Sequence, residues 1–452
     1  MAVLNHWADQ YASLNERTTI RERVTLRPAP LSEEFLAANE FSADLLFQRL
    51  SDCYLPTEAD LNFIQQMLSK AQAHAVSQYA DDKAFHRNVH AQELELPPAR
   101  PVMLCGQAGV GKSSVAAAIH RLLASEQRRI TVQGFNGDWQ LAPFALVRMS
   151  GIHSLGDVYR MLADTEAFSS AKRYSAGRRM QNFAIKKLYR EGCCLLGLDE
   201  FQFVTQGLTA NALVTKILLG VVYLCVPFFY VCNFSLVNRL LSRNVEDIQR
   251  LLADVVVLEP DPPESNDWKM LLAEYQRIGN AVFDFELVEQ GSKLWNMCAG
   301  IKRHLVVLLS TAYREARSAG RKKAQLQDVS AAYGSIAFGA QRRDVELLIS
   351  QAIQRKPLRA DLWSPIRGQS AHGTKYQHAL VHARQAKLAS VSINSALTVA
   401  EQAALEHMGN AASDADATAT RSTAAAKKGK RKMSASDLIA AANSFESSRM
   451  KR

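Results

Sequence analysis

The sequence predicts an α/β fold with a parallel-sheet core and a small all-helical lid. A helical N-terminal extension and a disordered basic C-terminal tail are expected to flank them. An apolar run at residues 102–105 is followed by a glycine-rich turn and a helical pattern. Two more apolar runs, at residues 193–198 and 226–232, each end in polar residues. Continuous apolar runs of this length are typical of strands buried on both faces of a parallel sheet.

The glycine-rich turn matches the GxxxxGKS pattern of a phosphate-binding P-loop, and it lies between a strand and a helix as that motif requires. Glycines let the backbone curl so that successive N–H groups point at phosphate oxygens, and the helix N-terminus adds partial positive charge. We expect Lys112 to reach the β- and γ-phosphates and the Ser113 hydroxyl to hold Mg²⁺; the alternative is a turn that binds nothing. The residues expected to bind ATP are Gly106, Gln107, Ala108, Gly109, Val110, Gly111, Lys112, Ser113 and Ser114.

The composition bounds the class of protein. Over 452 residues, 48% are hydrophobic and 22% charged, which suits a globular chain of two or three domains. The net charge of +10 favours an acidic partner, with nucleic acid first. The seven cysteines include no C-x-x-C pair, which indicates reduced, buried thiols and a cytoplasmic location. No apolar stretch is long enough to span a membrane, and we expect no membrane partner.

Periodicity and composition divide the chain into five parts. Leu61, Ile64 and Leu68 recur at helical spacing in the first part, where we find no catalytic motif and expect packing or partner docking. The last part lacks apolar periodicity, and its basic cluster at residues 427–432 either binds nucleic acid or is merely solvated. The parts are the N-terminal extension (1–95), the nucleotide-binding core (96–260), the helical lid (261–340), a linker (341–366) and the low-complexity basic tail (367–452).

The stretch between the P-loop and the second motif leaves alternatives open. Residues 134–139 form either a hairpin that exposes an aromatic side chain or an ordinary surface loop. The apolar run at residues 144–147 is expected to be a further core strand. Residues 172–190 are strongly basic. Most of these charges are expected to face water on a helix; the alternative is that a subset of them contacts DNA phosphates.

The second motif is the buried run at residues 193–198, which ends in Asp199 and Glu200. An apolar strand ending in two acids resembles a Walker B element, and we expect it one strand over from the P-loop strand in the same parallel sheet. Asp199 is then expected in the magnesium shell, and Glu200 is expected to polarise the water that attacks the γ-phosphate. Adjacent acids after apolar residues also occur by chance, but here they accompany a P-loop.

Asn233 ends the strand at residues 226–232, next to the Walker B strand. A polar side chain at this point would sense the γ-phosphate, the role called sensor 1 in AAA+ ATPases, although asparagine is also a routine turn residue. An arginine finger, which completes a neighbouring subunit's site, is expected from the following helical stretch. We favour Arg250, then Arg243; otherwise each is a solvated helix charge. In the lid, Arg303 is either sensor 2, which reports the γ-phosphate to the lid, or a surface arginine.

Five stretches together resemble the TnsC/TniB family of transposon AAA+ regulators. The resemblance covers about residues 96–335, and the DEFQ form of Walker B is closer to this family than to AAA+ unfoldases. The arginine followed by an apolar strand, prolines and an aromatic-containing lid helix is also similar to the family. The stretches are GQAGVGKSS, LLGLDEFQ, VCN, DIQRLLADVVVLEPDPPESNDWKMLLAEYQ and AGIKRHL.

The resemblance implies an ATPase that uses ATP and Mg²⁺ and assembles on double-stranded DNA as a ring or helical filament. A target-selection protein would recruit this homo-oligomer, which would in turn recruit and activate a DDE-type transposase. Hydrolysis would drive disassembly, and the location would be the bacterial cytoplasm, at the nucleoid. The N-terminal extension and the tail are longer than in shorter family members, which suggests docking sites for the target selector and the transposase, respectively. The family roles fall on Lys112, Ser113, Asp199, Glu200, Asn233, Arg250 and Arg303.

Two other functions remain open at this point. One is a replication initiator or loader-type AAA+ ATPase, which shares the core and should carry a sequence-specific DNA-binding domain or a clamp-binding motif. The other is a signalling P-loop NTPase whose nucleotide switch acts on protein partners without DNA. DNA-stimulated ATPase activity separates this last reading from the two that involve DNA.

Overall fold

The computed structural model describes residues 5–12, 14, 16–37, 41–91, 93–94, 96–124, 129–135, 137–163, 176–201, 210–366 and 371–396. The chain divides into two compact units, Met1–Arg384 and Gln385–Arg452. The core and lid described below belong to the first unit. Residues 172–175 of the basic stretch, the last residue of the DEFQ motif (Gln202) and the cluster at residues 427–432 lie outside the described residues.

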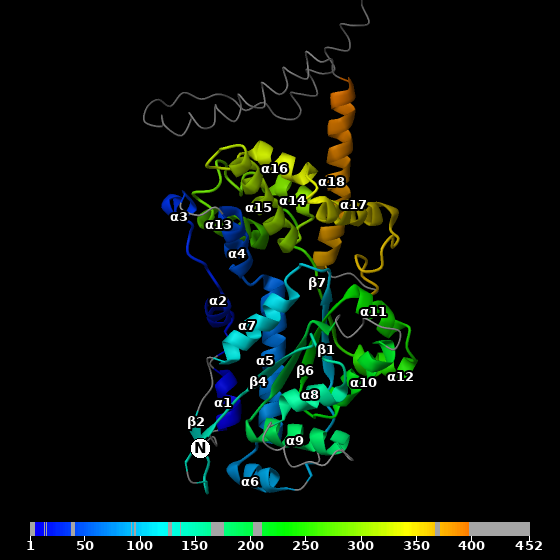
Figure 1. Ribbon diagram of the computed structural model, residues 1–452. Coiled ribbons are helices and arrows are strands. Elements are labelled where there is room, and N and C mark those ends of the chain that lie inside the picture. The colour runs from blue at the N-terminus through cyan, green and yellow to red at the C-terminus, as the bar shows by residue number, and fades with distance from the viewer. Residues whose placement is uncertain are drawn as a thin grey trace, which may run out of the picture. The chain divides into compact units, whose positions relative to one another are not determined.

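A five-stranded sheet forms the centre of the first unit, with strand order β4-β5-β6-β1-β7 (Figure 1). All four strand pairings are parallel, as the continuous apolar runs predict. The helices between successive strands make the crossovers that parallel pairing requires. The strands are β1 (Pro101–Gly106), β4 (Phe144–Arg148), β5 (Leu195–Asp199), β6 (Phe228–Asn233) and β7 (Val255–Leu258).

The strand register brings the polar strand ends to one edge of the sheet. Gly106 at the end of β1 lies opposite Asn233 in β6 and opposite Leu258 in β7. The expectation that the strand ending in Asp199 lies directly beside the P-loop strand is wrong, because β6 lies between β1 and β5. The chain first runs out to β4 at the sheet edge, returns through β5, and then fills the place next to β1 with β6.

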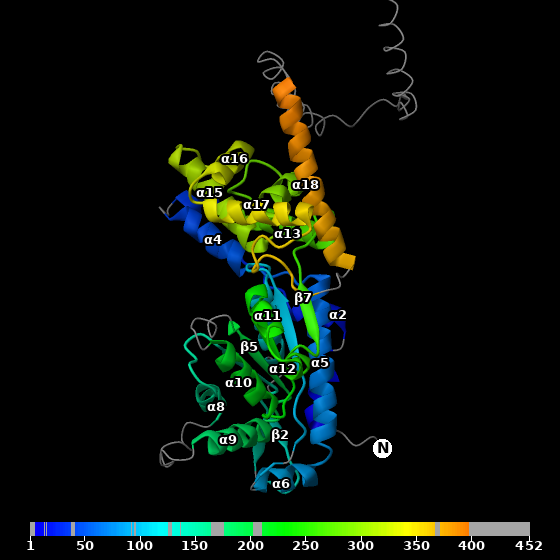
Figure 2. The same cartoon turned by 90° about the vertical axis from the view of Figure 1, so that its right-hand side faces the viewer.

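The alternation of side chains along β1 separates two helical layers. Val102 and Leu104 pack into one hydrophobic cluster with α5 and α7, whereas Met103 and Cys105 pack into another with α8 to α12. Figures 1 and 2 show the sheet between these layers. The helices are α5 (Glu58–Gln78) and α7 (Lys112–Ala124) on one face, and α8 (Leu155–Leu162), α9 (Ala176–Arg190), α10 (Ala210–Val222), α11 (Phe234–Leu241) and α12 (Val245–Leu251) on the other.

The N-terminal helices are shared between the α/β core and the lid. Trp7 stacks on Tyr79 with ring centroids 5.3 Å apart, in the cluster that covers the sheet. Leu46 and Leu50 are instead buried in the lid cluster. These helices therefore join the two parts of the unit. They are α1 (His6–Ala12), α2 (Arg17–Val24), α3 (Glu33–Ala37), α4 (Ser42–Asp52), α5 and α6 (Asp82–His90).

The lid is all-helical, and its hydrophobic cluster is built on Trp268, Trp295 and Tyr313. The structure differs from the sequence expectation beyond residue 340, because α17 and the first part of α18 also belong to this cluster. Tyr376 and Leu380 of α18 are both buried there. Their sparse spacing among Ala, Gln and His residues hides the apolar face from a compositional reading. The lid helices are α13 (Asn266–Ile278), α14 (Gly291–Cys298), α15 (Lys302–Ser318), α16 (Leu326–Gly334), α17 (Gly339–Gln354) and α18 (Ala371–Ala396).

The turn-rich stretch after α7 forms an antiparallel hairpin of β2 (Arg129–Thr131) and β3 (Asp138–Gln140). Its aromatic side chains pack inward, since Trp139 donates a hydrogen bond to the Arg190 carbonyl and Phe135 stacks on His86 with centroids 4.2 Å apart. Among the described residues, no helix is long and apolar enough to cross a membrane.

Because β1 and β7 approach closely at Gly106, a side chain at this position is expected to destabilise the protein. A Cβ atom at residue 106 would lie 2.3 Å from the Leu258 carbonyl oxygen, which is backbone. Gly106→Ala is therefore expected to lower the free energy of unfolding by about 1–3 kcal/mol, as overpacking does. Urea or thermal unfolding measures this. The control is Gly339→Ala, because nothing lies within 4 Å of a Cβ there. If the two variants had the same free energy of unfolding, the close contact at Gly106 would be contradicted.

Candidate functional site

The turn between β1 and α7 has the shape of a phosphate cradle. Gly109 has a φ of 84° and Gly111 a φ of 114°, both in the left-handed region that side chains disfavour. These two glycines turn the chain from the end of the strand into the first turn of α7. The N-terminus of α7 follows this turn directly, at Lys112, and a helix N-terminus favours an anion.

Lys112 is buried within the P-loop. Its Nζ donates hydrogen bonds to the carbonyl oxygens of Gly106 at 2.9 Å and Gln107 at 2.7 Å. Burial, with a smaller contribution from the neighbouring positive charge of Arg303, lowers the pKa of Lys112 to about 8. An ammonium group that is desolvated in this way gains most when an anion is bound beside it.

Ser113, Asp199 and Glu200 meet where the P-loop faces the end of β5. The Ser113 hydroxyl donates to Asp199 Oδ1 at 3.0 Å, and the backbone N–H of Glu200 donates to the same oxygen at 2.8 Å. Glu200 has a φ of 60°, an unusual conformation for a residue with a side chain. This hydroxyl and carboxylate are hard oxygen ligands of the type that Mg²⁺ prefers.

The oxygen pair fits a magnesium ion that is bound together with phosphates. Mg²⁺ typically takes one or two protein oxygens and completes its shell with water and substrate phosphates. Within the described residues, no group of three or more His, Cys, Asp or Glu side chains is arranged to hold a metal. Ser113 and Asp199 are thus suited to share an ion with a bound nucleotide.

Asn233 and the lid complete the surroundings of the P-loop. Asn233 lies opposite Gly106 in the sheet and lines the same pocket. The backbone N–H of Arg303, in the first turn of α15, donates to the Gly109 carbonyl oxygen at 3.2 Å. A Cβ at residue 109 would lie 2.8 Å from the Arg303 Cβ, so only glycine permits this approach. Lys302 and Arg303 therefore add two cations to the site.

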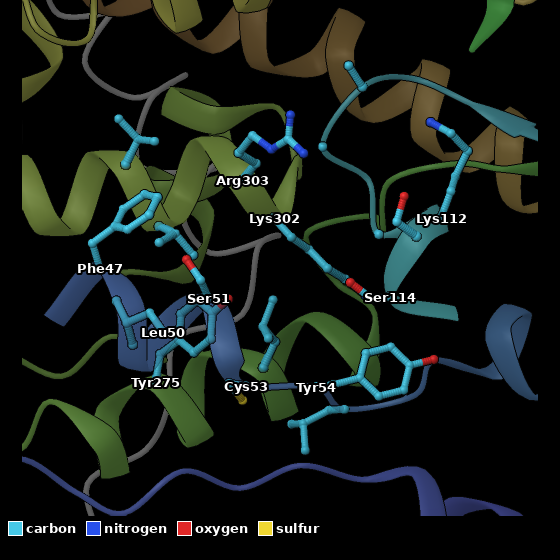
Figure 3. Close-up of a pocket in the computed structure, with 18 of the residues that line it drawn as sticks. Phe47, Leu50, Ser51, Cys53, Tyr54, Lys112, Ser114, Tyr275, Lys302 and Arg303 are labelled. Atoms are coloured by element: carbon cyan, nitrogen blue, oxygen red, sulfur yellow. The ribbon is translucent and has the colours of Figure 1, made fainter. Parts of the chain in front are cut away.

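The pocket has a volume of about 420 Å³ and two chemically different sides. The P-loop and the start of α15 supply its polar side. Its other side comes from α4, the segment after α4, α13 and α15 (Figure 3). This combination of a cationic end and an apolar end suits a nucleotide, whose phosphates and base differ in the same way. The apolar side includes Leu50, Tyr54, Leu271, Tyr275 and Val306.

The sequence motifs do not predict the apolar side of the pocket. Neither Leu50 nor Tyr54 belongs to a motif, and residues 1–95 are expected from the sequence only to pack or to dock a partner. Tyr275 was part of the quoted family resemblance without a role. The only sequence signal for these positions is helical periodicity, which does not distinguish a core position from a pocket wall. Lys302 was also missed, although it is next to the chosen Arg303.

The two arginines proposed as fingers lie outside the pocket. Arg250 of α12 is exposed and has no ion pair or side-chain hydrogen bond to another described residue. Arg243 is half-buried and pairs with Asp247 at 3.3 Å. The structure therefore brings together Lys112, Ser113, Asp199, Asn233 and Arg303, and it leaves the arginine candidates elsewhere.

Comparisons with known proteins give no close relative. No protein-family model and no curated protein matches the sequence. Among solved structures, the chain is similar to the Aeropyrum pernix ORC2 protein in its ADPNP–ADP complexes, with 14% identity and a TM-score of 0.41, covering 67% of this chain and 76% of that one. The Aeropyrum pernix ORC1 protein in complex with DNA gives 18% identity and a TM-score of 0.39, with coverages of 69% and 72%.

The Thermotoga maritima RuvB Holliday junction branch migration motor is a third similar structure, with 15% identity and a TM-score of 0.32, covering 57% of this chain and 70% of that one. Because the identities and TM-scores are this low, we infer no activity and no partner of this chain from these structures. The strand order, the P-loop between β1 and α7, and the helical lid define the class on their own. The fold is that of an AAA+ P-loop NTPase.

His304, next to Arg303 in the AAA+ lid, is buried, and its burial should make the stability of the protein depend on pH. Burial lowers its pKa to about 4, and its Nδ1 has no partner among the described residues. Between pH 6.5 and 4 the unfolded chain binds a proton that the folded chain does not. Stability should therefore fall as the pH falls through this window, by up to about 3 kcal/mol.

Urea unfolding at several pH values tests this dependence. His304→Gln should reduce the slope of stability against pH between 6.5 and 4. A part of the slope should remain, because burial also lowers the pKa of His74 to about 4. The control is His153→Gln, because His153 is exposed and should leave the slope unchanged. An identical slope in wild type and His304→Gln would show that His304 is not the group responsible.

Proposed function

We propose that this chain is an AAA+ ATPase that regulates DNA transposition by assembling on double-stranded DNA. In this role it links a target-selection protein to a transposase. The observation that carries the proposal is an asymmetry of charge around the P-loop. Lys112, Lys302 and Arg303 face the pocket within one chain, whereas the exposed Arg250 lies outside it. A site that lacks a finger of its own is completed by a neighbouring copy.

Within one protomer, each residue of the site has a separate role in binding or hydrolysing ATP. Lys112 and Arg303 neutralise the phosphates, and the apolar side of the pocket holds the base. Ser113 and Asp199 hold Mg²⁺, which, when bound, stabilises the negative charge on the transferring phosphoryl group. Asn233 senses the γ-phosphate from the end of β6. Glu200 orients and polarises the attacking water, and its backbone bond to Asp199 fixes it beside the ion site.

The surface around α12 suits contact with a second copy. Val245 is 67% exposed and Leu241 is 38% exposed. Apolar side chains beside an arginine are typical of the core of an interface. Arg250 from this surface completes the neighbour's site, so ATP binds the assembled state more tightly than the isolated protomer. Differential affinity of this kind is sufficient to shift the equilibrium toward a ring or filament.

Nucleic acid is the partner that the charge favours. The net charge is +10, and α9 exposes Arg178, Arg179 and Arg190. Contacts of this type follow the phosphates and carry no base preference. The duplex is therefore bound without sequence specificity, and the choice of target is left to the partner protein.

The transposition role is supported by the resemblance to the TnsC/TniB family over residues 96–335. The N-terminal helices are proposed to receive the target-selection protein, and the segment beyond residue 384 the transposase. Because α4 packs in the lid and α5 on the sheet, a protein bound to the N-terminal helices would contact both the lid and the α/β core. Target selection is thereby connected to nucleotide state.

A complementation experiment tests the assembled site. Wild-type protein should hydrolyse ATP faster when duplex DNA is added. Lys112→Ala should bind no nucleotide, and Arg250→Ala should bind it but lose roughly 10³-fold in turnover, as expected of a missing finger. Each is inactive alone. A mixture of the two should recover DNA-stimulated hydrolysis, because an Arg250→Ala site can lie against an intact finger.

The matched control is Arg243→Ala, since Arg243 already pairs with Asp247 and should keep most of its turnover. A mixture as inactive as its components would exclude Arg250 as the finger. Wild-type hydrolysis that ignores duplex DNA would contradict the transposition role and favour a signalling NTPase.

A further inference from the structure

Gln107, the second residue of the P-loop, faces two parts of the molecule at once. Its carbonyl oxygen accepts the hydrogen bond from Lys112 Nζ at 2.7 Å. Its side chain points the other way, and Nε2 donates to the carbonyl oxygen of Leu362 at 3.3 Å, 255 residues further along the chain. Gln107 is 5% exposed, so this second contact lies in the interior. A P-loop residue that only binds phosphates through its backbone does not need a buried amide side chain.

The partner of Gln107 is a segment that we call the C-terminal strap, residues 358–366. The Gln351 side chain of α17 accepts hydrogen bonds from the backbone N–H groups of Leu358 and Arg359, at 2.9 and 2.8 Å. Arg359 also pairs with Asp344 at 2.7 Å. The strap is thus fixed to the lid at one end, and its other end follows the edge strand β7.

A second cavity separates the strap from that strand. It has a volume of about 690 Å³ and is lined by β7, the strap, Gln107 and Tyr376. Figure 2 shows α18 beside the other lid helices, above β7. The strap and the edge strand thus line one cavity, and the Gln107 side chain bonds the strap at Leu362.

Tyr376 of α18 links the same place to the lid. Its hydroxyl donates to the Ala299 carbonyl oxygen at 3.2 Å, and its buried ring lies edge-on to Trp295. The Gln107 side chain is close enough to this hydroxyl to influence its pKa, which burial raises. Ala299 ends α14 and precedes the turn into α15, the helix that places Arg303 against Gly109. One buried tyrosine thus contacts the lid turn and lines the same cavity as the Gln107 side chain.

We propose that Gln107 is a positioning residue that couples nucleotide binding at the P-loop to the docking of the C-terminal strap and α18. The inference rests on the proposed binding of ATP by this site. Phosphates attract Lys112 away from the Gln107 carbonyl, and the P-loop must then keep its shape without that bond. The strap holds the Gln107 side chain by a hydrogen bond, and Tyr376 lines the same cavity. The P-loop is therefore already partly ordered before the nucleotide binds, which lowers the entropy cost of binding.

Thermodynamic linkage gives the proposal a second consequence. If docking of the strap and α18 strengthens nucleotide binding, nucleotide must strengthen their docking by the same factor. Because α18 continues into the unit that begins at Gln385, occupancy of the pocket would be transmitted toward the C-terminal part of the chain.

The test compares two tyrosine variants of the full-length protein. Tyr376→Phe removes only the hydroxyl that donates to the Ala299 carbonyl oxygen. It should weaken binding of a fluorescent ATP analogue about five-fold, the effect of losing roughly one hydrogen bond. Tyr313→Phe is the matched control. Tyr313 is buried in the same lid cluster, but its hydroxyl has no partner among the described residues, and this variant should bind the analogue as wild type does.

Hydrogen exchange supplies the reciprocal measurement. In wild type, the analogue should slow exchange at residues 358–366 and 372–384, and Gln107→Leu should lose this protection. Wild type that binds no nucleotide would refute the proposed function instead. If wild type binds and Tyr376→Phe binds as tightly or more tightly, or if the analogue leaves exchange of both segments unchanged, the coupling is refuted.

Discussion

The hydrogen bond from the Arg303 N–H to the Gly109 carbonyl is the contact on which the nucleotide site depends. It joins the first turn of a lid helix to the most sharply curved part of the P-loop, and it exists only because Gly109 has no side chain. Through this contact the lid adds Lys302 and Arg303 to the P-loop, whose own cation is Lys112. The same contact also sets the apolar side of the pocket beside the P-loop, since α13 and α15 belong to the lid.

The sequence motifs predict the polar half of this site because their chemistry is local. A P-loop needs its residues in one short run, and Asp199 and Asn233 each end an apolar strand that pattern alone identifies. Parallel pairing then brings the strand ends together. Strand order is a different kind of information. Nothing in the runs themselves distinguishes β6 from β5 as the neighbour of β1, and the expectation for β5 was wrong.

The parts that sequence reasoning did not predict depend on contacts between distant residues. Leu50 and Tyr275 form one wall of the pocket although they lie far apart along the chain. Gln107 contacts Leu362 across an even longer separation. Tyr376 lies in a stretch whose composition indicates a disordered tail, yet it is buried in the lid. Helical periodicity indicates that such residues are buried. Only the fold shows which residues they pack against.

The N-terminal helices, the lid and the strap all border the nucleotide pocket or the P-loop, so each reports on the same ligand. The central claim is that ATP joins copies of this chain along a duplex. Electron microscopy of purified protein, with and without a non-hydrolysable ATP analogue and duplex DNA, tests it most directly. The account predicts ordered oligomers on DNA only when the analogue is present. Association that is indifferent to the analogue, or no binding to duplex DNA at low ionic strength, would contradict it.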